Sequence, residues 1–179
     1  MSRRALFTVD PKTLQQLAPH LQRALVIDAG AASARLLGDL LRSLAATQVW
    51  TAASTAEALR LARVIDPQIV FAEYEGPELD GPAFTRTLRR SGLPCRKVPV
   101  IMVTSTATPS AILAARDSGV HEFLRKPYAL KDLVRRLEAV FLKEREWIDA
   151  QMYVGPDRRR FNSAEFQGRR KRKADAAAA

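Results

Sequence analysis

Four polar side chains follow apolar runs that are typical of buried strands. Asp28 and Glu73 each end such a run, and Thr104 and Lys126 each follow a later one. A lone carboxylate is costly to bury without a partner, so we expect these side chains at the mouth of a sheet rather than inside it. Two carboxylates, a hydroxyl and an ammonium at one edge of a sheet indicate a functional site.

The runs that position these side chains alternate with segments at helical spacing. Strands are expected near residues 24–28, 48–51, 69–73, 98–103 and 121–124, and helices near 32–46, 55–65, 81–90 and 109–118, with a last helix from about 130 that has no firm stop before Gly155-Pro156. This alternation predicts an α/β fold, in which helices cover both faces of a parallel sheet. Sites in such folds lie outside the carboxyl ends of the strands.

The basic charge of the chain is concentrated at its end. The chain has 179 residues and a formal net charge of +10, and residues 151–179 hold 8 Lys and Arg against 3 Asp and Glu, which is half of the excess. Such a segment is either a solvated end or a device for binding an anionic partner. We expect a loosely docked extension over 1–22, a domain over 23–146 and a flexible basic tail over 147–179.

Several function classes lack support in the sequence. The one cysteine, Cys95, excludes an internal disulfide, and no apolar run has the length of a signal peptide or membrane span, so a cytoplasmic protein is expected. His20 and His121 lie far apart without further ligands at metal-binding spacing, so no metal is expected. Arg96 and Lys97 would lower the pKa of Cys95, but a bystander thiol is the simpler interpretation. No constellation supports enzyme activity.

Three motifs carry a resemblance to a known family. They are the stretch Pro67–Gly81, the sequence Val103-Thr104-Ser105 and the sequence Phe123-Leu124-Arg125-Lys126-Pro127. Together they resemble the CheY-like receiver domain of two-component response regulators. The resemblance implies a flavodoxin-like sheet with strand order 2-1-3-4-5. It also implies that Asp28, Glu73, Thr104 and Lys126 form a degenerate phosphorylation site.

Two departures from the family's pattern put phosphotransfer in doubt. Ala29 stands where the family has a second acidic residue, and Glu73 stands where it has the phosphoacceptor Asp. Mg²⁺ needs several oxygen ligands in tight octahedral geometry, so no Mg²⁺ is expected here. Glu73 is long enough to pair with Lys126, which would fix an active-like state. Simple decay of an unused site is the other interpretation.

The last segment interleaves basic clusters with aromatic residues. Arg recognises the O6 and N7 edge of guanine, and a carboxylate accepts from the opposite edge. The segment resembles the arginine-rich C-terminal segments of CheY-like proteins that bind cyclic di-GMP. The candidate ligand-binding residues are Tyr153, Asp157, Arg158, Arg159, Arg160, Phe161, Arg169 and Arg170, with Tyr153 or Phe161 stacking on a base.

These observations lead to two functional hypotheses. The first is a phosphorylation-independent, single-domain response regulator that binds cyclic di-GMP and docks on a protein partner, which by family resemblance is a flagellar motor switch component. The second is an adaptor whose basic tail binds nucleic acid. Nucleic-acid affinity would fall more steeply with salt than affinity for a guanine pocket.

Overall fold

A five-stranded parallel sheet forms the centre of the protein. The computed structural model describes residues 9–159. The strands are β1 (Arg23–Ile27), β2 (Gln48–Ala52), β3 (Ile69–Glu73), β6 (Val100–Thr104) and β7 (Glu122–Arg125), in the order β2-β1-β3-β6-β7. All four neighbouring pairs are parallel. The flavodoxin-like order implied by the resemblance is confirmed.

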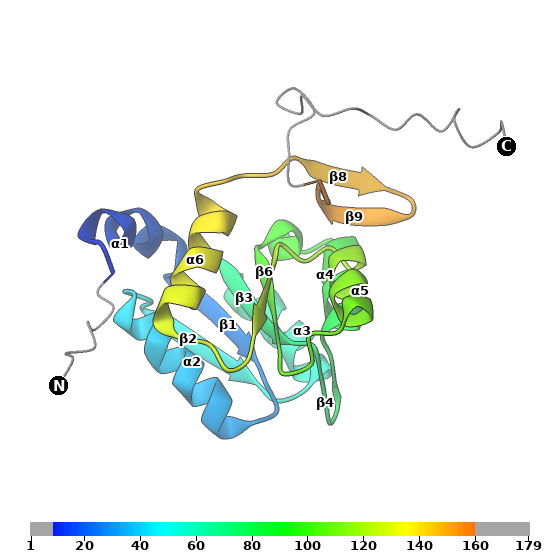
Figure 1. The fold of residues 1–179 in the computed structure, drawn as a ribbon. Helices are drawn as coiled ribbons and strands as arrows, with labels where there is room; N and C mark the ends of the chain where they lie inside the picture. Colours follow the sequence, from blue (N-terminus) through cyan, green and yellow to red (C-terminus); the bar gives the residue numbers. More distant parts are fainter. Residues whose placement is uncertain (1–8, 160–179) are drawn as a thin grey trace, which may run out of the picture.

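Helices cover both faces of this sheet (Figure 1). On one face lie α1 (Pro11–Leu17), α2 (Ala31–Ser43) and α6 (Leu130–Phe141), and on the other lie α3 (Thr55–Ile65), α4 (Gly81–Arg90) and α5 (Pro109–Asp117). The strands are buried on both sides, which explains why their sequences are continuous apolar runs rather than alternating ones. Within residues 9–159, no helix has the length and apolar content needed to cross a membrane.

The helices begin at the capping residues that the sequence indicates. Side-chain oxygens of Asp10, Ser54, Asp80 and Thr108 accept hydrogen bonds from backbone N–H groups three residues later. Each cap satisfies an N–H group that has no partner inside its helix. A short antiparallel pair, β4 (Glu75–Gly76) and β5 (Leu79–Asp80), leads from the central strand β3 into α4.

The N-terminal segment is part of the core, and the expected loose docking is wrong for residues 9–22. Leu17 and Leu21 have no exposed surface and belong to the apolar cluster under α2 and α6. Pro19 does end α1, but the chain continues through a short 3₁₀ helix, η1 (Ala18–His20). Burial of two leucines contributes about 1.5–3 kcal/mol for each side chain.

The chain after α6 also differs from the expectation. The helix ends at Phe141, and a β-hairpin follows, made of β8 (Trp147–Ala150) and β9 (Tyr153–Pro156). Figure 1 shows this hairpin in orange beyond one end of the sheet, and β9 contacts α4. The segment is therefore folded on the body as far as Arg159, and the expectation of a flexible tail is wrong for 147–159.

A buried arginine supports the hairpin. The Arg89 guanidinium is 1% exposed and donates to the carbonyl oxygens of Gly119, Arg96 and Val98. Its central carbon lies 5.2 Å from the centre of the Trp147 ring, within the range of a cation–π contact. The three carbonyl oxygens and the aromatic face thus compensate the guanidinium for the hydration that it loses on burial.

A glycine at the hairpin contact provides a stability test. Gly119 has a φ of +94°, and a Cβ there would clash with the carbonyl oxygen of Val154 in β9. We expect Gly119→Ala to lower the free energy of unfolding by about 1–3 kcal/mol, the usual range for such backbone strain. Urea unfolding measures the loss.

The matched control is Gly92→Ala, because a Cβ at Gly92 meets no atom within 4 Å. Its stability should stay within about 0.5 kcal/mol of the wild type. Equal stability of the two variants would show that β9 does not pack against Gly119 in solution.

Candidate functional site

The four candidate side chains of the sheet meet at one edge. Asp28 directly follows β1, Glu73 and Thr104 end β3 and β6, and Lys126 directly follows β7. Ile27 pairs with Ala72 across β1 and β3, so Asp28 and Glu73 occupy adjacent strand ends. The carboxyl ends of the parallel strands therefore bring together residues that lie 98 positions apart in the chain, Asp28 and Lys126.

The Lys126 ammonium joins the two carboxylates. Its Nζ atom lies 2.8 Å from Asp28 Oδ2 and 2.8 Å from Glu73 Oε1. The side chains of Lys126, Asp28 and Glu73 are 19%, 7% and 18% exposed, so water screens these bonds less than it would on the open surface. The pairing of Glu73 with Lys126 that its length suggested is present.

The protonation of this cluster follows from its hydrogen bonds. Burial alone would raise the pKa of Asp28, but bonds from Lys126, Ser33 and the Gly30 N–H outweigh burial and hold that pKa below its usual value. Burial would lower the pKa of Lys126, but the two carboxylates raise it above its usual value. Both groups are therefore charged at neutral pH.

Thr104 belongs to the edge but not to the ion-pair cluster. Its hydroxyl donates to the Thr106 carbonyl at 3.1 Å and accepts from the Thr106 N–H at 3.0 Å. The side chain is 1% exposed. Phe123, the first residue of the motif that contains Lys126, is partly buried against the cluster under α3 and α4.

The residues at this edge do not fit a Mg²⁺ ion. Ala29 offers a methyl group beside Asp28, and Lys126 already occupies an oxygen of each carboxylate. Between residues 9 and 159 there is no group of three or more His, Cys, Asp or Glu side chains arranged to hold a metal. A hard cation would have to displace the ammonium and would still lack a ligand.

Tyr153 does not offer the stacking surface that the sequence suggested. It is 7% exposed, its hydroxyl donates to the Pro156 carbonyl at 2.6 Å, and the Arg158 guanidinium lies 4.6 Å from the ring centre. Its ring packs in the hairpin because β9 folds back on α4, a contact that no local pattern indicates. Tyr153 is therefore a structural residue of the hairpin.

The arginines after the hairpin are partly engaged. Arg158 pairs with Asp117 at 2.8 Å, and its hydrogen bond, with a second from Arg116, lowers the pKa of Asp117. Asp157 Oδ1 accepts from the Arg159 N–H at 3.0 Å. The Asp157 carbonyl accepts from Arg145 at 3.3 Å. Arg160, Phe161, Arg169 and Arg170 lie outside the described residues.

Cys95 is not an activated thiol. It is 5% exposed in the 3₁₀ helix η2 (Pro94–Lys97), and its Sγ lies 3.4 Å from the Ala62 carbonyl. Burial raises its pKa, and Asp66 adds to that rise. The thiol packs in the apolar core, and this agrees with the expected bystander rather than with a thiol activated by Arg96 and Lys97.

Comparison with known proteins decides the family. A family model described as "Response regulator receiver domain" matches residues 24–138. This chain belongs to the response regulator receiver family. Receiver domains act in two-component signalling, and the match spans every strand of the central sheet together with the four residues of the carboxyl edge.

Individual receivers are similar to this chain over the same stretch. The response regulator MprA of Mycobacterium avium is 30% identical over 95 residues, which cover 53% of this chain and 40% of MprA. This chain thus spans less than half the length of the curated relatives it matches.

Solved receiver structures agree with the fold. The Vibrio cholerae chemotaxis protein CheY4 has a TM-score of 0.62 at 21% identity and covers 67% of this chain and 98% of its own. The receiver domain of the Pseudomonas aeruginosa sensor histidine kinase PA1611 has a TM-score of 0.59 at 26% identity and covers 65% of this chain and 94% of its own. That structure holds a magnesium ion in its active-site cleft.

Two arginines that matter to this receiver were missed in the sequence. Arg89 shares the buried stripe of α4 with Phe84 and Leu88, so an arginine at a core position was the available signal. Arg145 donates to the carbonyl oxygens of His121 and Asp157 and so connects the body to the C-terminal segment. No local pattern predicts that connection.

The ammonium bridge predicts the effect of removing Lys126. In Lys126→Met the buried Asp28 carboxylate loses its ion pair, so its pKa should rise and the free energy of unfolding should fall by about 1–3 kcal/mol. Carboxyl ¹³C NMR titration reports that pKa. Lys131→Met, an exposed change on α6, is the control. An unshifted Asp28 pKa in Lys126→Met would contradict the bridge.

Proposed function

We propose that this receiver signals without relying on phosphotransfer. The observation that carries the proposal is the Lys126 ammonium bonded to Asp28 and Glu73 at 2.8 Å each. In the unmodified site, Lys126 already balances the charge of both carboxylates, so no metal ion is needed for that purpose. Ala29 supplies no oxygen ligand for Mg²⁺. The charges at this edge are balanced without Mg²⁺ or a phosphoryl group.

We further propose that Glu73 keeps the receiver in an active-like state. Glu73 is one methylene longer than Asp, and its carboxylate reaches Lys126 from the end of β3. Docking on a protein partner would then depend on this residue. Weaker docking of Glu73→Ala supports the proposal, and unchanged docking favours decay of an unused site.

The proposed input is cyclic di-GMP bound by the C-terminal segment. Support comes from the chemistry at its described end, where a carboxylate residue, Asp157, and two arginines, Arg158 and Arg159, directly follow β9. Arg158 would have to leave Asp117 to reach a ligand. The further contacts from Arg160, Phe161, Arg169 and Arg170 are proposed from the sequence.

The proposed output is docking on a protein, and a flagellar motor switch component is the partner class we propose from the resemblance to CheY-like proteins. A nucleic acid is the alternative ligand for the basic segment. The presence of Asp157 among the arginines favours a guanine ligand, because a carboxylate accepts from the base but repels phosphate.

The first test concerns phosphorylation. Incubation with acetyl phosphate, or with beryllofluoride, in the presence of Mg²⁺ should leave the amide NMR spectrum unchanged, because Lys126 occupies both carboxylates. Intact-mass measurement should find no acyl phosphate. A stoichiometric, Mg²⁺-dependent modification at Glu73 would refute phosphorylation independence.

The second test concerns the nucleotide. In calorimetric titration, Asp157→Ala and Arg159→Ala should each weaken cyclic di-GMP binding by about 1–3 kcal/mol, the scale of one lost base contact. Arg63→Ala, an exposed change on α3, should bind as the wild type does. Equal affinity in all four proteins would contradict the proposed site, and a steep loss of affinity for single-stranded oligonucleotides with salt would favour the nucleic-acid alternative.

A further inference from the structure

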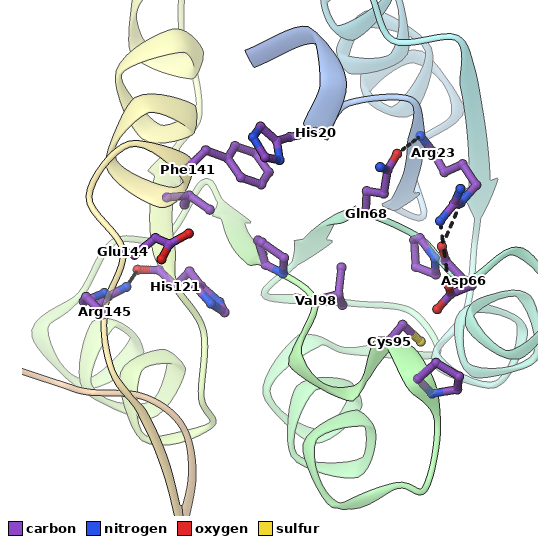
Figure 2. Close-up of a pocket in the computed structure, with 14 residues that line it drawn as sticks. His20, Arg23, Asp66, Gln68, Cys95, Val98, His121, Phe141, Glu144 and Arg145 are labelled. Atoms are coloured by element: carbon purple, nitrogen blue, oxygen red, sulfur yellow. Dashed lines mark hydrogen bonds and ion pairs between the residues drawn. The ribbon is translucent and has the colours of Figure 1, made fainter. Parts of the chain in front are cut away.

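A groove opens at the amino ends of the strands, opposite the ion-pair cluster. It has a volume of about 470 Å³ and lies between the end of α6 and the beginnings of β1 and β3 (Figure 2). Ligand sites commonly have volumes in this range, roughly 300–1,000 Å³. No function described above uses this groove.

One wall of the groove is a flat aromatic pair. The rings of His20 and Phe141 stack with centroids 4.5 Å apart and an interplanar angle of 14°. Figure 2 shows this pair at the groove with Gln68 and Arg23 on the opposite side. Each ring covers one face of the other, so the pair offers a planar ligand the outer face of one ring.

His121, which lines the same groove, carries a hydrogen-bond donor with no acceptor among residues 9–159. His121 Nδ1 lies 3.3 Å from both the Val100 N–H nitrogen and Arg89 Nη2. Two donors at Nδ1 require that this nitrogen accept, so the ring proton resides on Nε2. Nε2 has no hydrogen-bond partner in the region 9–159, and His121 lines the groove.

The imidazole is a fixed neutral donor. Burial, together with Arg89 and Arg145, holds the pKa of His121 well below its usual value. A neutral ring keeps one N–H and does not repel a cationic neighbour. The donor is therefore held in place before any ligand arrives.

An acceptor lies beside this donor. Glu144 is exposed at the groove, forms no ion pair with any residue between 9 and 159, and in Figure 2 lies between Phe141 and His121. An imidazole N–H and a carboxylate next to a flat wall match guanine, which accepts at O6 and N7 and donates from its N1 and N2 edge. Adenine presents an acceptor at N1 instead and would oppose the carboxylate.

The groove is connected to the C-terminal segment by Arg145. This side chain lines the groove and donates to the carbonyl oxygens of His121 and Asp157. One side chain of the groove is therefore hydrogen-bonded to the backbone of Asp157.

We propose that the groove binds one guanine of a guanine nucleotide, with Glu144 and His121 holding its edges and one outer ring face of the stacked His20–Phe141 pair lying against the base. The inference rests on the proposed function for its physiological ligand, cyclic di-GMP, whose second guanine the arginine segment would hold. The groove alone predicts weak binding of a mononucleotide.

The test uses GMP and AMP with the full chain, observed by amide NMR, and cyclic di-GMP observed by calorimetry. GMP should shift the signals of His121, Phe141 and Glu144, and AMP should shift them less. Glu144→Gln should weaken GMP and cyclic di-GMP binding by about tenfold, the scale of one lost charged hydrogen bond. Glu146→Gln, an exposed change outside the groove, is the matched control and should bind as the wild type does.

The outcomes separate the two proposals. Cyclic di-GMP binding that depends on Asp157 but not on Glu144, with no GMP shifts at the groove, would overturn the groove and leave the proposed function intact. GMP shifts that depend on Glu144, with cyclic di-GMP binding no tighter than GMP, would support the groove and overturn the arginine segment. Equal shifts from GMP and AMP would overturn the guanine assignment.

Discussion

The carboxyl edge of this receiver depends on one ammonium group held between two carboxylates. Asp28 is almost fully buried, and without a cation its charge would be costly to keep away from water. Lys126 supplies that cation from the segment after β7, and Glu73 shares it from the end of β3. The ammonium thereby joins the ends of β1, β3 and β7 at the position of the family's phosphorylation site.

The opposite end of the sheet is organised around a second buried cation, Arg89. Its guanidinium binds carbonyl oxygens in the loops that precede β6 and β7 and faces Trp147 of the hairpin. His121 is hydrogen-bonded to Arg89 and lines the groove. Arg89 and His121 therefore connect the hairpin to the groove. A ligand bound at this end would contact side chains of the folded domain rather than those of a separate tail.

The sequence predicted the strands and the four edge residues, because continuous apolar runs and capping residues are local signals. The strand order was implied by the family resemblance alone. The sequence also predicted the Glu73–Lys126 pair from side-chain length. It failed where contacts between distant segments decide the structure. Leu17 and Leu21 gain their burial from α2 and α6, and the hairpin holds its place through Arg89 and Gly119, which lie far away in the chain. Tyr153 was misassigned for the same reason.

We propose that the lysine bridge replaces the metal and phosphate chemistry of the edge. The most direct measurement is an amide NMR titration with Mg²⁺ of the wild type and of a variant with Ala29→Asp and Glu73→Asp together, which restores the family's acidic residues. We expect the signals near Asp28 and Glu73 to stay in place in the wild type at millimolar Mg²⁺ and to shift to saturation in the variant. Saturable shifts in the wild type with the same affinity as the variant would contradict this proposal.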